Sequence, residues 1–555
     1  MKSAQEVSEA KLRGGFYTPD DLVDLCLERI AELAAPGKLE AVEPSIGDGA
    51  FVRGLARSPL HRRIARLDGV EVMELEAEKA RRAMRVAGIE GHVERRSAVA
   101  WAGQTDVGYD VAIGNPPFLR YQFIGDCDRA ATKALGERLR LPFAGVGNLW
   151  IPVLLGTLSR LRPGGVFAFV VPSECFTGVS ASLARGWLAR HCAALRFDVF
   201  PPGSFPGALQ EVFVLSGSIT ASGRGADRVR IVEKRADGAI TDHWHVLDAS
   251  GPWTKYLLPP AQVAAFNAAA SGRGVVPVGE LVAFEVSIVT GANDFFTVSC
   301  EDLANHQLES WGRPLLPRIR YAPGLTYTKA DHERTMADGA ASWILDFSDE
   351  RPSPSGAAAL YLAQGELMKL HQRYKCKIRK PWYRVPGFRR GEMLLSKRSH
   401  HYPRVVLNDA GVYTTDTIYR GRLLQASVSA ETIASNFHNS FTLLTAELEG
   451  RSFGGGVLEL VPSETARLLV PVERAHDELL GQLDLAARSG DPALLVAQTD
   501  ASIVSRGLVD RDVMSELANA RESLARRRFD RNGQPVTVSP SGEPLFSGSA
   551  QHSVA

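Results

Sequence analysis

The sequence predicts an α/β protein in which a doubly wound sheet is followed by a mixed α+β domain. Through the first 220 residues, short apolar runs rich in β-branched residues alternate with amphipathic helical segments. That alternation is typical of a largely parallel sheet with helices on both faces. The chain has 555 residues, 45% of them hydrophobic and 23% charged, which is too long for one hydrophobic core. Two or three domains are therefore expected.

Charge and cysteine usage limit the classes of function. The formal net charge is +1, so any surface for nucleic acid must be local. The six cysteines are scattered without a CxxC pair or a histidine cluster at ligand spacing, which predicts no metal site and a reduced compartment. The N-terminal segment has no apolar core, and no run of about 18 apolar residues occurs. We therefore expect a cytoplasmic protein that neither crosses a membrane nor is exported.

A glycine loop follows the first predicted strand, which begins at residue 39. A helix over 20–27, with Pro19 in its first turn, precedes this strand. The strand runs into Gly47-Asp48-Gly49, and a second helix is predicted from Phe51 to Arg57. Glycines let backbone N–H groups approach a ligand, and no Lys-Ser/Thr pair follows to make a Walker loop. A cationic or zwitterionic ligand is expected rather than a polyphosphate; the alternative is an ordinary glycine-rich βα turn.

An acidic residue closes the next predicted strand, over 70–74. Nucleotide-type α/β folds hold a ribose with a carboxylate at this place, which makes Glu74 the candidate. Glu71 and Glu76 are neighbours that could be mistaken for it, and a solvated helix start is the alternative reading. A third strand and its loop are expected over 92–98.

The segment Asn115-Pro116-Pro117-Phe118 follows a buried strand predicted over 109–114. The prolines fix φ and keep Asn115 extended at the carboxyl edge of the sheet, where open α/β proteins bind ligands. The Asn115 side-chain oxygen and the Pro116 carbonyl are two acceptors, and Phe118 adds an aromatic face. This set suits a planar NH2 group on a stacked ring. The alternative is an Asn-Pro turn after a core strand.

The sheet continues with a helix over 148–161 and a strand over 166–172, and the sequence then turns polar and Gly/Ala-rich from 222 to 275. We place the boundary between domains in that region. The predicted division is a first domain over 1–225, a connecting segment over 226–275, a second domain over 276–475, a helical segment over 476–530 and a disordered tail over 531–555.

A basic stretch lies in the second predicted domain. From His371 to Arg404 it holds 11 Lys/Arg residues against one acid, Glu392, with aromatic residues interleaved. A charge run is usually a solvated face, but this excess in a nearly neutral chain favours phosphate binding. The candidate contacts are Lys380, Arg384, Arg389, Arg390 and Arg404.

Several motifs, taken in order and spacing, resemble the gamma-class N6-adenine DNA methyltransferases of restriction-modification systems, type II modification methylases among them. Over residues 10–220 they are FYTP, EPSIGDGAF, the acid of VMELE, GNPPF and RPGGVFAFVVPSECF. More weakly, VTGANDFF, KPWYRVP, SHHYPRVVLND and RSFGGGVLELVPSE, within 275–470, resemble the target-recognition region of such enzymes.

The resemblance implies a class I S-adenosylmethionine-dependent methyltransferase sheet followed by a DNA target-recognition domain. It implies S-adenosylmethionine as the cofactor, without a metal, and catalysis at Asn115, Pro116, Pro117 and Phe118 on a flipped adenine. FYTP would close over the cofactor, the loop from Glu43 to Gly49 would hold its methionine end, and Glu74 its ribose. The cofactor residues so implied are Tyr17, Thr18, Glu43, Pro44, Ser45, Gly47, Asp48, Gly49, Phe51, Glu74, Ser97 and Asn115.

Two positions depart from the family pattern. Ser97 stands where many members have an acid for the cofactor adenine, and Phe118 stands where Tyr is commoner. Arg120 and Tyr121 follow immediately and could contact the DNA backbone or fill the space that the flipped base leaves. Duplex DNA is the implied partner, with a separately encoded restriction endonuclease as companion and location at the nucleoid through DNA.

Other functions use the same motif. Enzymes that methylate a glutamine amide in proteins or a guanine amine in ribosomal RNA share NPP(Y/F), and an inactive DNA-binding homologue is the non-enzymatic alternative. The FYTP segment before the cofactor loop and the long region after the first domain favour DNA methylation.

Overall fold

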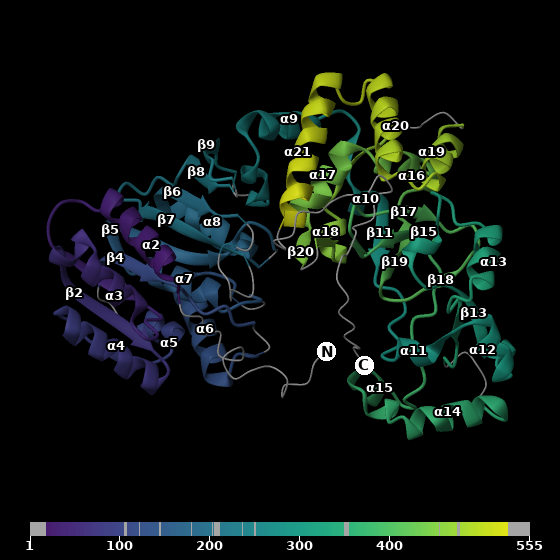
Figure 1. The fold of residues 1–555 in the computed structure, drawn as a ribbon, viewed down its shortest axis with the longest axis horizontal. Helices are drawn as coiled ribbons and strands as arrows, with labels where there is room; N and C mark the ends of the chain where they lie inside the picture. The colour runs from purple at the N-terminus through teal and green to yellow at the C-terminus, as the bar shows by residue number, and fades with distance from the viewer. Residues whose placement is uncertain are drawn as a thin grey trace. The chain divides into compact units, whose positions relative to one another are not determined.

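The computed structural model describes residues 18–530 except 105–107, 121–122, 144–145, 179, 202–203, 205–210, 236, 249–250, 349–353, 454–455 and 474–477. The chain forms two compact units, unit 1 up to Pro260 and unit 2 from Ala261 (Figure 1). No helix in these described ranges is long and apolar enough to cross a membrane.

Unit 1 is built on one mixed sheet with the strand order β3-β2-β1-β4-β5-β7-β6-β8-β9. The pairs from β3 to β5 are parallel, whereas β7 runs antiparallel to both β5 and β6. The strands are β1 (Leu39–Glu43), β2 (Ile64–Glu71), β3 (Val93–Arg95), β4 (Tyr109–Gly114), β5 (Leu161–Pro172), β6 (Cys192–Val199), β7 (Val212–Ile219), β8 (Arg228–Lys234) and β9 (Ile240–Val246).

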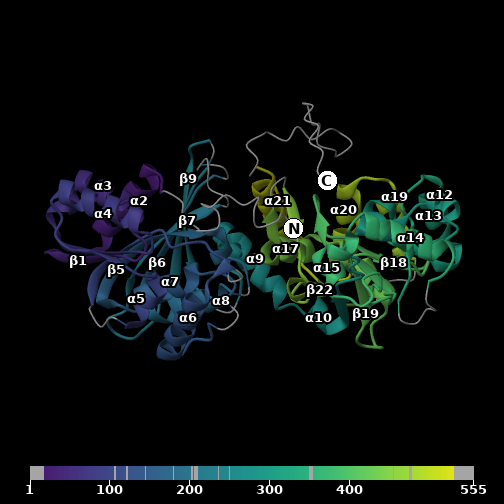
Figure 2. The same ribbon diagram turned by 90° about the horizontal axis from the view of Figure 1, so that it is seen from below.

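Helices cover both faces of this sheet, which confirms the predicted doubly wound α/β class (Figure 2). In β4, Val111 and Ile113 pack with the helices of one face, and Ala112 packs with those of the other. This is why the strand reads as a continuous apolar run. The first face carries α2 (Asp20–Leu33), α3 (Ala50–Arg57) and α4 (Glu74–Ala87); the second carries α5 (Ala98–Gln104), α6 (Asp126–Leu139), α7 (Trp150–Leu158) and α8 (Ser182–His191).

The segment predicted as a connection, 226–275, holds β8 and β9 of this sheet and all of α9 (Pro260–Ala270). In β9 exposed residues alternate with two partly buried ones and the buried His245, so its sequence resembles a polar loop rather than a buried strand.

Unit 2 combines small sheets with helices. Its sheets have the orders β10-β22, β11-β19-β15-β17, β12-β14-β13-β18 and β16-β21-β20. The strands are β10 (Val275–Pro277), β11 (Val282–Glu285), β12 (Thr297–Val298), β13 (Gly312–Leu316), β14 (Trp343–Leu345), β15 (Met393–Ser396), β16 (Arg398–Ser399), β17 (Val405–Leu407), β18 (Tyr413–Thr414), β19 (Ile418–Leu423), β20 (Arg451–Phe453), β21 (Val457–Glu459) and β22 (Leu469–Pro471).

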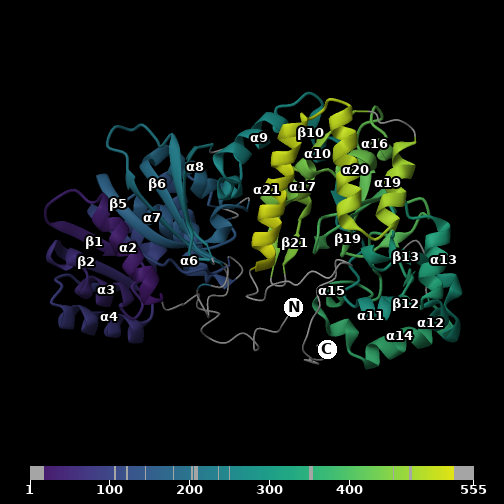
Figure 3. The same ribbon diagram turned by 45° about the horizontal axis from the view of Figure 1, so that its top comes forward.

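The C-terminal helices α19, α20 and α21 pack in sequence beside the sheets of unit 2, and α21 also packs on α17 (Figure 3). The helices of unit 2 after α9 are α10 (Val278–Leu281), α11 (Asn293–Phe296), α12 (Cys300–Asn305), α13 (Lys329–Ala337), α14 (Ala357–Leu367), α15 (Tyr374–Lys377), α16 (Ala430–Phe437), α17 (Ser440–Glu449), α18 (Pro462–Thr465), α19 (Leu479–Arg488), α20 (Pro492–Ser505) and α21 (Arg511–Asp530).

Candidate active site

The candidate site lies at the carboxyl ends of β1 and β4, neighbouring strands at the point where the strand order of unit 1 reverses. Ligands bind at this position in open α/β sheets. β1 ends at Glu43 and β4 ends at Gly114, which is followed directly by Asn115. A Cβ on Gly114 would lie 3.5 Å from the Glu43 Cγ atom, so the two strand ends are close.

The glycine loop after β1 turns sharply against α4. Gly47 and Gly49 have φ values of +53° and +83°, in the left-handed region that favours glycine. A Cβ on Gly49 would also lie only 3.0 Å from the Cβ of Ala83 and 3.2 Å from the Cα of Ala80. Gly49 is therefore required both by its backbone conformation and by the close approach of α4.

Carboxylates surround this loop. Glu43 is only 2% exposed, and its Oε2 atom has no hydrogen-bond partner among the described residues. Burial, with the nearby charges of Asp48 and Glu71, holds the pKa of Glu43 well above its ordinary value. Asp48 pairs with Arg53 at 2.7 Å on the solvent side. A buried carboxyl oxygen without a partner costs free energy, and a hydrogen-bond donor or positive charge on a ligand would reduce that cost.

Glu71 lies at the loop, whereas Glu74, the residue that the sequence favours for the ribose, lies on the surface. The Glu71 carboxylate accepts hydrogen bonds from the N–H groups of Gly47 (3.1 Å) and Met73 (2.9 Å), and burial raises its pKa. Glu74 is the first residue of α4 and pairs on the surface with Arg81 (2.8 Å) and Arg95 (3.4 Å). The strand ends three residues earlier than expected because Glu71 turns the chain by binding these two amides.

Asn115 is held from two sides. Its Nδ2 atom donates to the Thr18 hydroxyl at 3.2 Å, and its main-chain carbonyl accepts from the Ser45 hydroxyl at 2.9 Å. Its Oδ1 atom is buried and has no partner among the described residues. Thr18 therefore lies beside Asn115 and leaves the amide oxygen available as an acceptor. Phe118 is partly buried and packs against the apolar residues on both faces of the sheet.

The other predicted residues of this site fall into three groups. Pro44 and Phe51 are buried beneath the loop, and Phe51 belongs to the apolar core. Ser97 follows β3, partly exposed, with its carbonyl bound to the N–H of Trp101. Arg120 is exposed and forms a β-bridge with Asn148, whereas Tyr17 and Tyr121 lie outside the described residues.

The predicted basic stretch divides between the surface and the core of unit 2. Lys380, Arg389 and Arg390 are exposed, and the Arg390 guanidinium lies 5.0 Å from the centre of the Tyr413 ring. Arg384 is partly buried. The interleaved aromatics mostly stabilise the fold: Trp382 is 8% exposed within the apolar core, and Tyr383, Phe388 and Tyr402 pack against core residues.

The Arg404 side chain is partly buried against a loop of unit 2. Its guanidinium donates to the carbonyls of Ala322 (2.8 Å), Pro323 (3.3 Å) and Gly324 (2.7 Å), and burial lowers the pKa of Arg404. These contacts satisfy three carbonyls of a loop and use most of the guanidinium donors. These contacts give Arg404 a role in the fold of unit 2, at a position where the sequence predicts phosphate binding.

Replacing Arg404 with Ala should lower the free energy of unfolding of unit 2 by about 3 kcal/mol, because three carbonyls lose a charged donor. Lys380→Ala, at an exposed position in the same stretch, is the matched control and should change it by less than ~0.5 kcal/mol. Denaturant unfolding of the full chain measures both. Equal stabilities of the two variants would contradict the structural role of Arg404.

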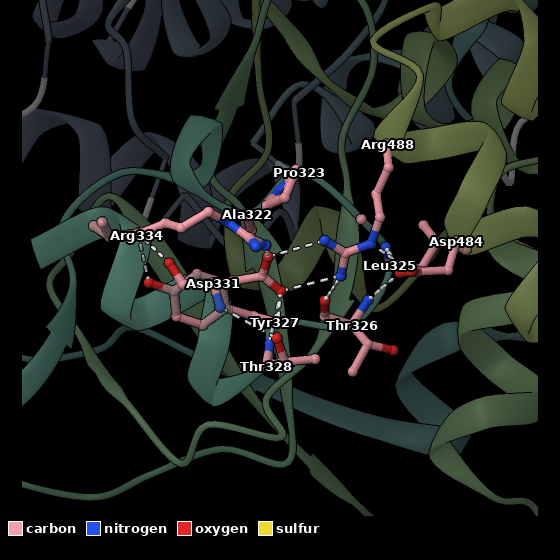
Figure 4. Close-up of polar contacts among 12 residues, drawn as sticks. Ala322, Pro323, Leu325, Thr326, Tyr327, Thr328, Asp331, Arg334, Asp484 and Arg488 are labelled. Atoms are coloured by element: carbon pink, nitrogen blue, oxygen red, sulfur yellow. Dashed lines mark hydrogen bonds and ion pairs between the residues drawn. The ribbon is translucent and has the colours of Figure 1, made fainter. Parts of the chain in front are cut away.

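The same loop is fixed by an ion-pair network that sequence reasoning did not find (Figure 4). Arg488 of α19 binds Asp331 at 2.9 Å and Asp484 at 2.6 Å, and Asp484 accepts from the N–H groups of Leu325 and Thr326. Burial acts to raise the pKa of Asp331, but hydrogen bonds from Arg488 and Thr328 outweigh it and lower that pKa. Residues more than 150 positions apart meet here, so no local pattern reveals them.

No group of three or more His, Cys, Asp or Glu side chains within the described ranges is arranged to hold a metal ion. The site itself presents buried acceptors, carboxylates and loop N–H groups.

Comparisons with known proteins agree with this fold. A model described as Eco57I restriction-modification methylase matches residues 71–200, and one described as the C-terminal domain of the type II methyltransferase M.Eco57I matches residues 250–504. The chain is similar to the type II methyltransferase M.XamI of Xanthomonas campestris pv. amaranthicola, with 22% identity over 83% of this chain and 86% of that protein. It is also similar to M.AccI of Acinetobacter calcoaceticus, with 19% identity over 64% of this chain and 68% of that protein.

Among solved structures, the type IIL restriction-modification enzyme MmeI, determined in complex with DNA, matches 92% of this chain and 71% of its own chain. The TM-score is 0.50 and the identity 14%, a likeness of fold. The family matches cover both units, the first including the strand that delivers Asn115 and the second most of unit 2. The chain therefore belongs to the Eco57I-type family of type II restriction-modification methyltransferases.

Proposed function

We propose that this chain transfers the methyl group of S-adenosylmethionine to N6 of an adenine swung out of duplex DNA. The observation that carries the proposal is a pair of buried acceptors without a partner among the described residues, Glu43 Oε2 and Asn115 Oδ1, at adjacent strand ends. The Glu43 carboxyl suits a cationic ligand, and the Asn115 amide oxygen suits a neutral amine. Membership of a restriction-modification methyltransferase family supports DNA as the substrate.

The residues around the glycine loop fit S-adenosylmethionine. Its ammonium and sulfonium groups are positive, and the negative charges of Asp48 and Glu71 lie near the buried Glu43 carboxyl at this loop. We assign Glu71 to the ribose hydroxyls, since it ends β2 and already binds the loop. Ser97 follows β3, the neighbour of β2, and we assign it a contact with the cofactor adenine.

Asn115 acts on the target amine. The nitrogen lone pair of an exocyclic adenine amine is delocalised into the ring, so the amine is a poor nucleophile. When Asn115 Oδ1 and the Pro116 carbonyl accept its two N–H bonds, they favour a more tetrahedral nitrogen with a localised lone pair. The rigid prolines hold both acceptors in place. Well-oriented reactants can gain ~7–11 kcal/mol from placement alone.

Bound S-adenosylmethionine supplies an electrophilic methyl group on a sulfonium. Asn115 and Pro116 would hold the amine with its lone pair toward that methyl group, the sulfur would keep the electrons of the C–S bond, and the proton of the methylated nitrogen would pass to water. No general base is needed before the transfer. Extruding the adenine costs a few kcal/mol, offset in part by stacking on Phe118.

Thr18 fixes which atom of the Asn115 amide faces the target, because its hydroxyl accepts from Nδ2 at 3.2 Å. Thr18→Val removes that acceptor and frees the amide to rotate, so turnover should fall about tenfold to a hundredfold. Thr18→Ser keeps the hydroxyl and should restore most of the rate. Steady-state transfer of labelled methyl groups at saturating cofactor measures both variants. If Val and Ser variants were equally active, the hydrogen bond would have no role in turnover.

Unit 2 is proposed to bind the duplex. Lys380, Arg389 and Arg390 are exposed cations in a stretch with one acidic residue, and such cations bind phosphates. Arg120, exposed beside the proposed adenine pocket, is the candidate contact of unit 1. The matched family supports a role in a restriction-modification system, and we propose that the chain protects host DNA beside a separately encoded endonuclease.

The function is tested by sequencing the host DNA for modified bases with and without this gene. We expect N6-methyladenine at one sequence motif, lost when the gene is deleted. Unchanged DNA combined with a methylated glutamine or a methylated ribosomal RNA guanine in the gene-bearing cells would replace DNA methylation by one of those activities.

A further inference from the structure

Unit 2 displays exposed apolar side chains at one turn within its basic stretch. This turn, here named the apolar-basic turn, runs from Leu367 at the end of α14, through the short helix at 370–372 and α15, to Lys380. Its exposed apolar residues are Leu367 (83% exposed), Met368 (63%), Tyr374 (70%) and Ile378 (64%). Neighbouring exposed apolar side chains of this size mark an interaction surface in a protein of mixed polar exterior.

Cations surround these apolar side chains. The turn contains no acidic residue, and its exposed basic residues are Lys369, Arg373, Lys375, Lys377 and Lys380. The nearest acid before the turn in sequence, Glu366, accepts a hydrogen bond from the Trp382 indole at 3.1 Å. The surface is therefore both apolar and strongly positive.

The turn is held firmly from beneath. Leu370 and Cys376 are 1% and 0% exposed and belong to the apolar core of unit 2. Arg379 points inward, where its guanidinium donates to the carbonyls of Val289 and Thr290 at 2.6 Å and 2.7 Å. A Cβ on Gly291 would lie 2.7 Å from the Lys375 Cβ, so α15 packs closely on that loop. The exposed side chains are thus presented on a fixed base.

We propose that the apolar-basic turn enters a groove of duplex DNA, with its lysines and Arg373 on the phosphates and with Tyr374 and Ile378 against bases and sugars. This inference rests on the proposed function, because it names the part of unit 2 that reads the same substrate. Phosphates lining a groove match the exposed cations of the turn, and thymine methyl groups and sugar faces match its exposed apolar side chains. A membrane surface also pairs with apolar and basic side chains, but it is bound by long amphipathic helices, whereas α15 has four residues.

The two kinds of side chain should behave differently in salt. Each phosphate contact contributes a slope of about −0.9 to log affinity against log salt, whereas an apolar contact with bases contributes none. We therefore measure the slope for the full chain by fluorescence anisotropy, on a duplex carrying the motif found by sequencing and on a scrambled copy.

The Tyr374→Ala/Ile378→Ala double variant should bind the motif duplex about tenfold more weakly with an unchanged slope, and the scrambled duplex as before. Lys375→Ala and Lys377→Ala should each make the slope shallower by about one on both duplexes. Leu485→Ala, which removes an equally exposed leucine (71%) from α19, is the control and should change neither quantity.

Failure of this inference and failure of the proposed function are distinguishable. If the unchanged chain methylates DNA and the double variant binds the motif duplex as tightly as it does, the turn does not enter a groove. If the chain binds vesicles of phosphatidylcholine and phosphatidylserine through these side chains and the DNA affinities do not change, the turn is a membrane surface instead. If the unchanged chain neither methylates nor binds any duplex, the proposed function fails and this inference fails with it.

Discussion

Asn115→Ala is expected to abolish methyl transfer while leaving the affinity for S-adenosylmethionine close to that of the unchanged chain. Asn115 Oδ1 is one of two acceptors proposed for the target amine, and it is buried and fixed through Thr18. Removing one preorganised hydrogen-bonding group in an active site costs about 10²–10³ in turnover. Transfer of tritiated methyl groups to DNA measures the loss, and titration calorimetry measures cofactor affinity.

The Asn115→Ala variant must also be folded for the comparison to count. Its melting temperature should lie close to that of the unchanged chain, since the deleted amide makes one side-chain hydrogen bond and Thr18 can turn to solvent. Activity above a tenth of the unchanged rate would mean that the target amine does not depend on Asn115.

Glu71→Ala is expected to weaken S-adenosylmethionine binding about tenfold to a hundredfold, the effect of losing a charge-assisted hydrogen bond of ~1.5–3 kcal/mol. Glu74→Ala is the matched control and should leave the affinity unchanged, because Glu74 pairs with Arg81 and Arg95 on the surface. Calorimetry on the full chain gives both affinities.

Glu71→Gln separates shape from charge. The Gly47 and Met73 N–H groups bind different oxygens of Glu71, so the amide keeps an acceptor for one of them while it removes the negative charge. Its affinity should fall between those of the unchanged chain and Glu71→Ala. A larger loss in Glu74→Ala than in Glu71→Ala would return the ribose contact to the residue that the sequence favoured.

The first unit was predictable because its signals are local. The strand expected over 109–114 matches β4, the helix expected from Phe51 matches α3 within one residue, and the α/β class is confirmed. A buried parallel strand gives a continuous apolar run, and a glycine turn with a following helix leaves a clear pattern. Asn115 could be singled out since two prolines constrain the backbone beside it.

Other features depend on contacts that a sequence does not display. Glu71 and Glu74 are three positions apart, and only the hydrogen bonds to Gly47 and Met73 distinguish them. In the sequence, Arg404 looks like the other cations of the basic stretch. Its hydrogen-bond partners, however, are loop carbonyls some eighty positions earlier in the chain. The roles of the site residues and the limits of the predicted domains stay predictions.

The interleaved aromatics of the basic stretch show the same limit. Trp382 is in the core, whereas Tyr374 is 70% exposed, although both stand among lysines and arginines. Periodicity does not separate them because the segment is an irregular succession of short helices and turns. Because of this difference in burial, the Tyr374 side chain can contact DNA and the Trp382 side chain cannot.

Methyl transfer to N6 of adenine in DNA can be tested by identifying the methylated nucleoside that the chain forms. The purified chain is incubated with unmethylated duplex DNA and S-adenosylmethionine carrying a deuterated methyl group, and the DNA is digested to nucleosides for mass spectrometry. Methyl transfer to adenine N6 predicts deuterated N6-methyldeoxyadenosine as the labelled nucleoside. The Asn115→Ala variant should form no labelled nucleoside. A labelled cytosine, or no labelled nucleoside from a chain that binds the cofactor, would contradict it.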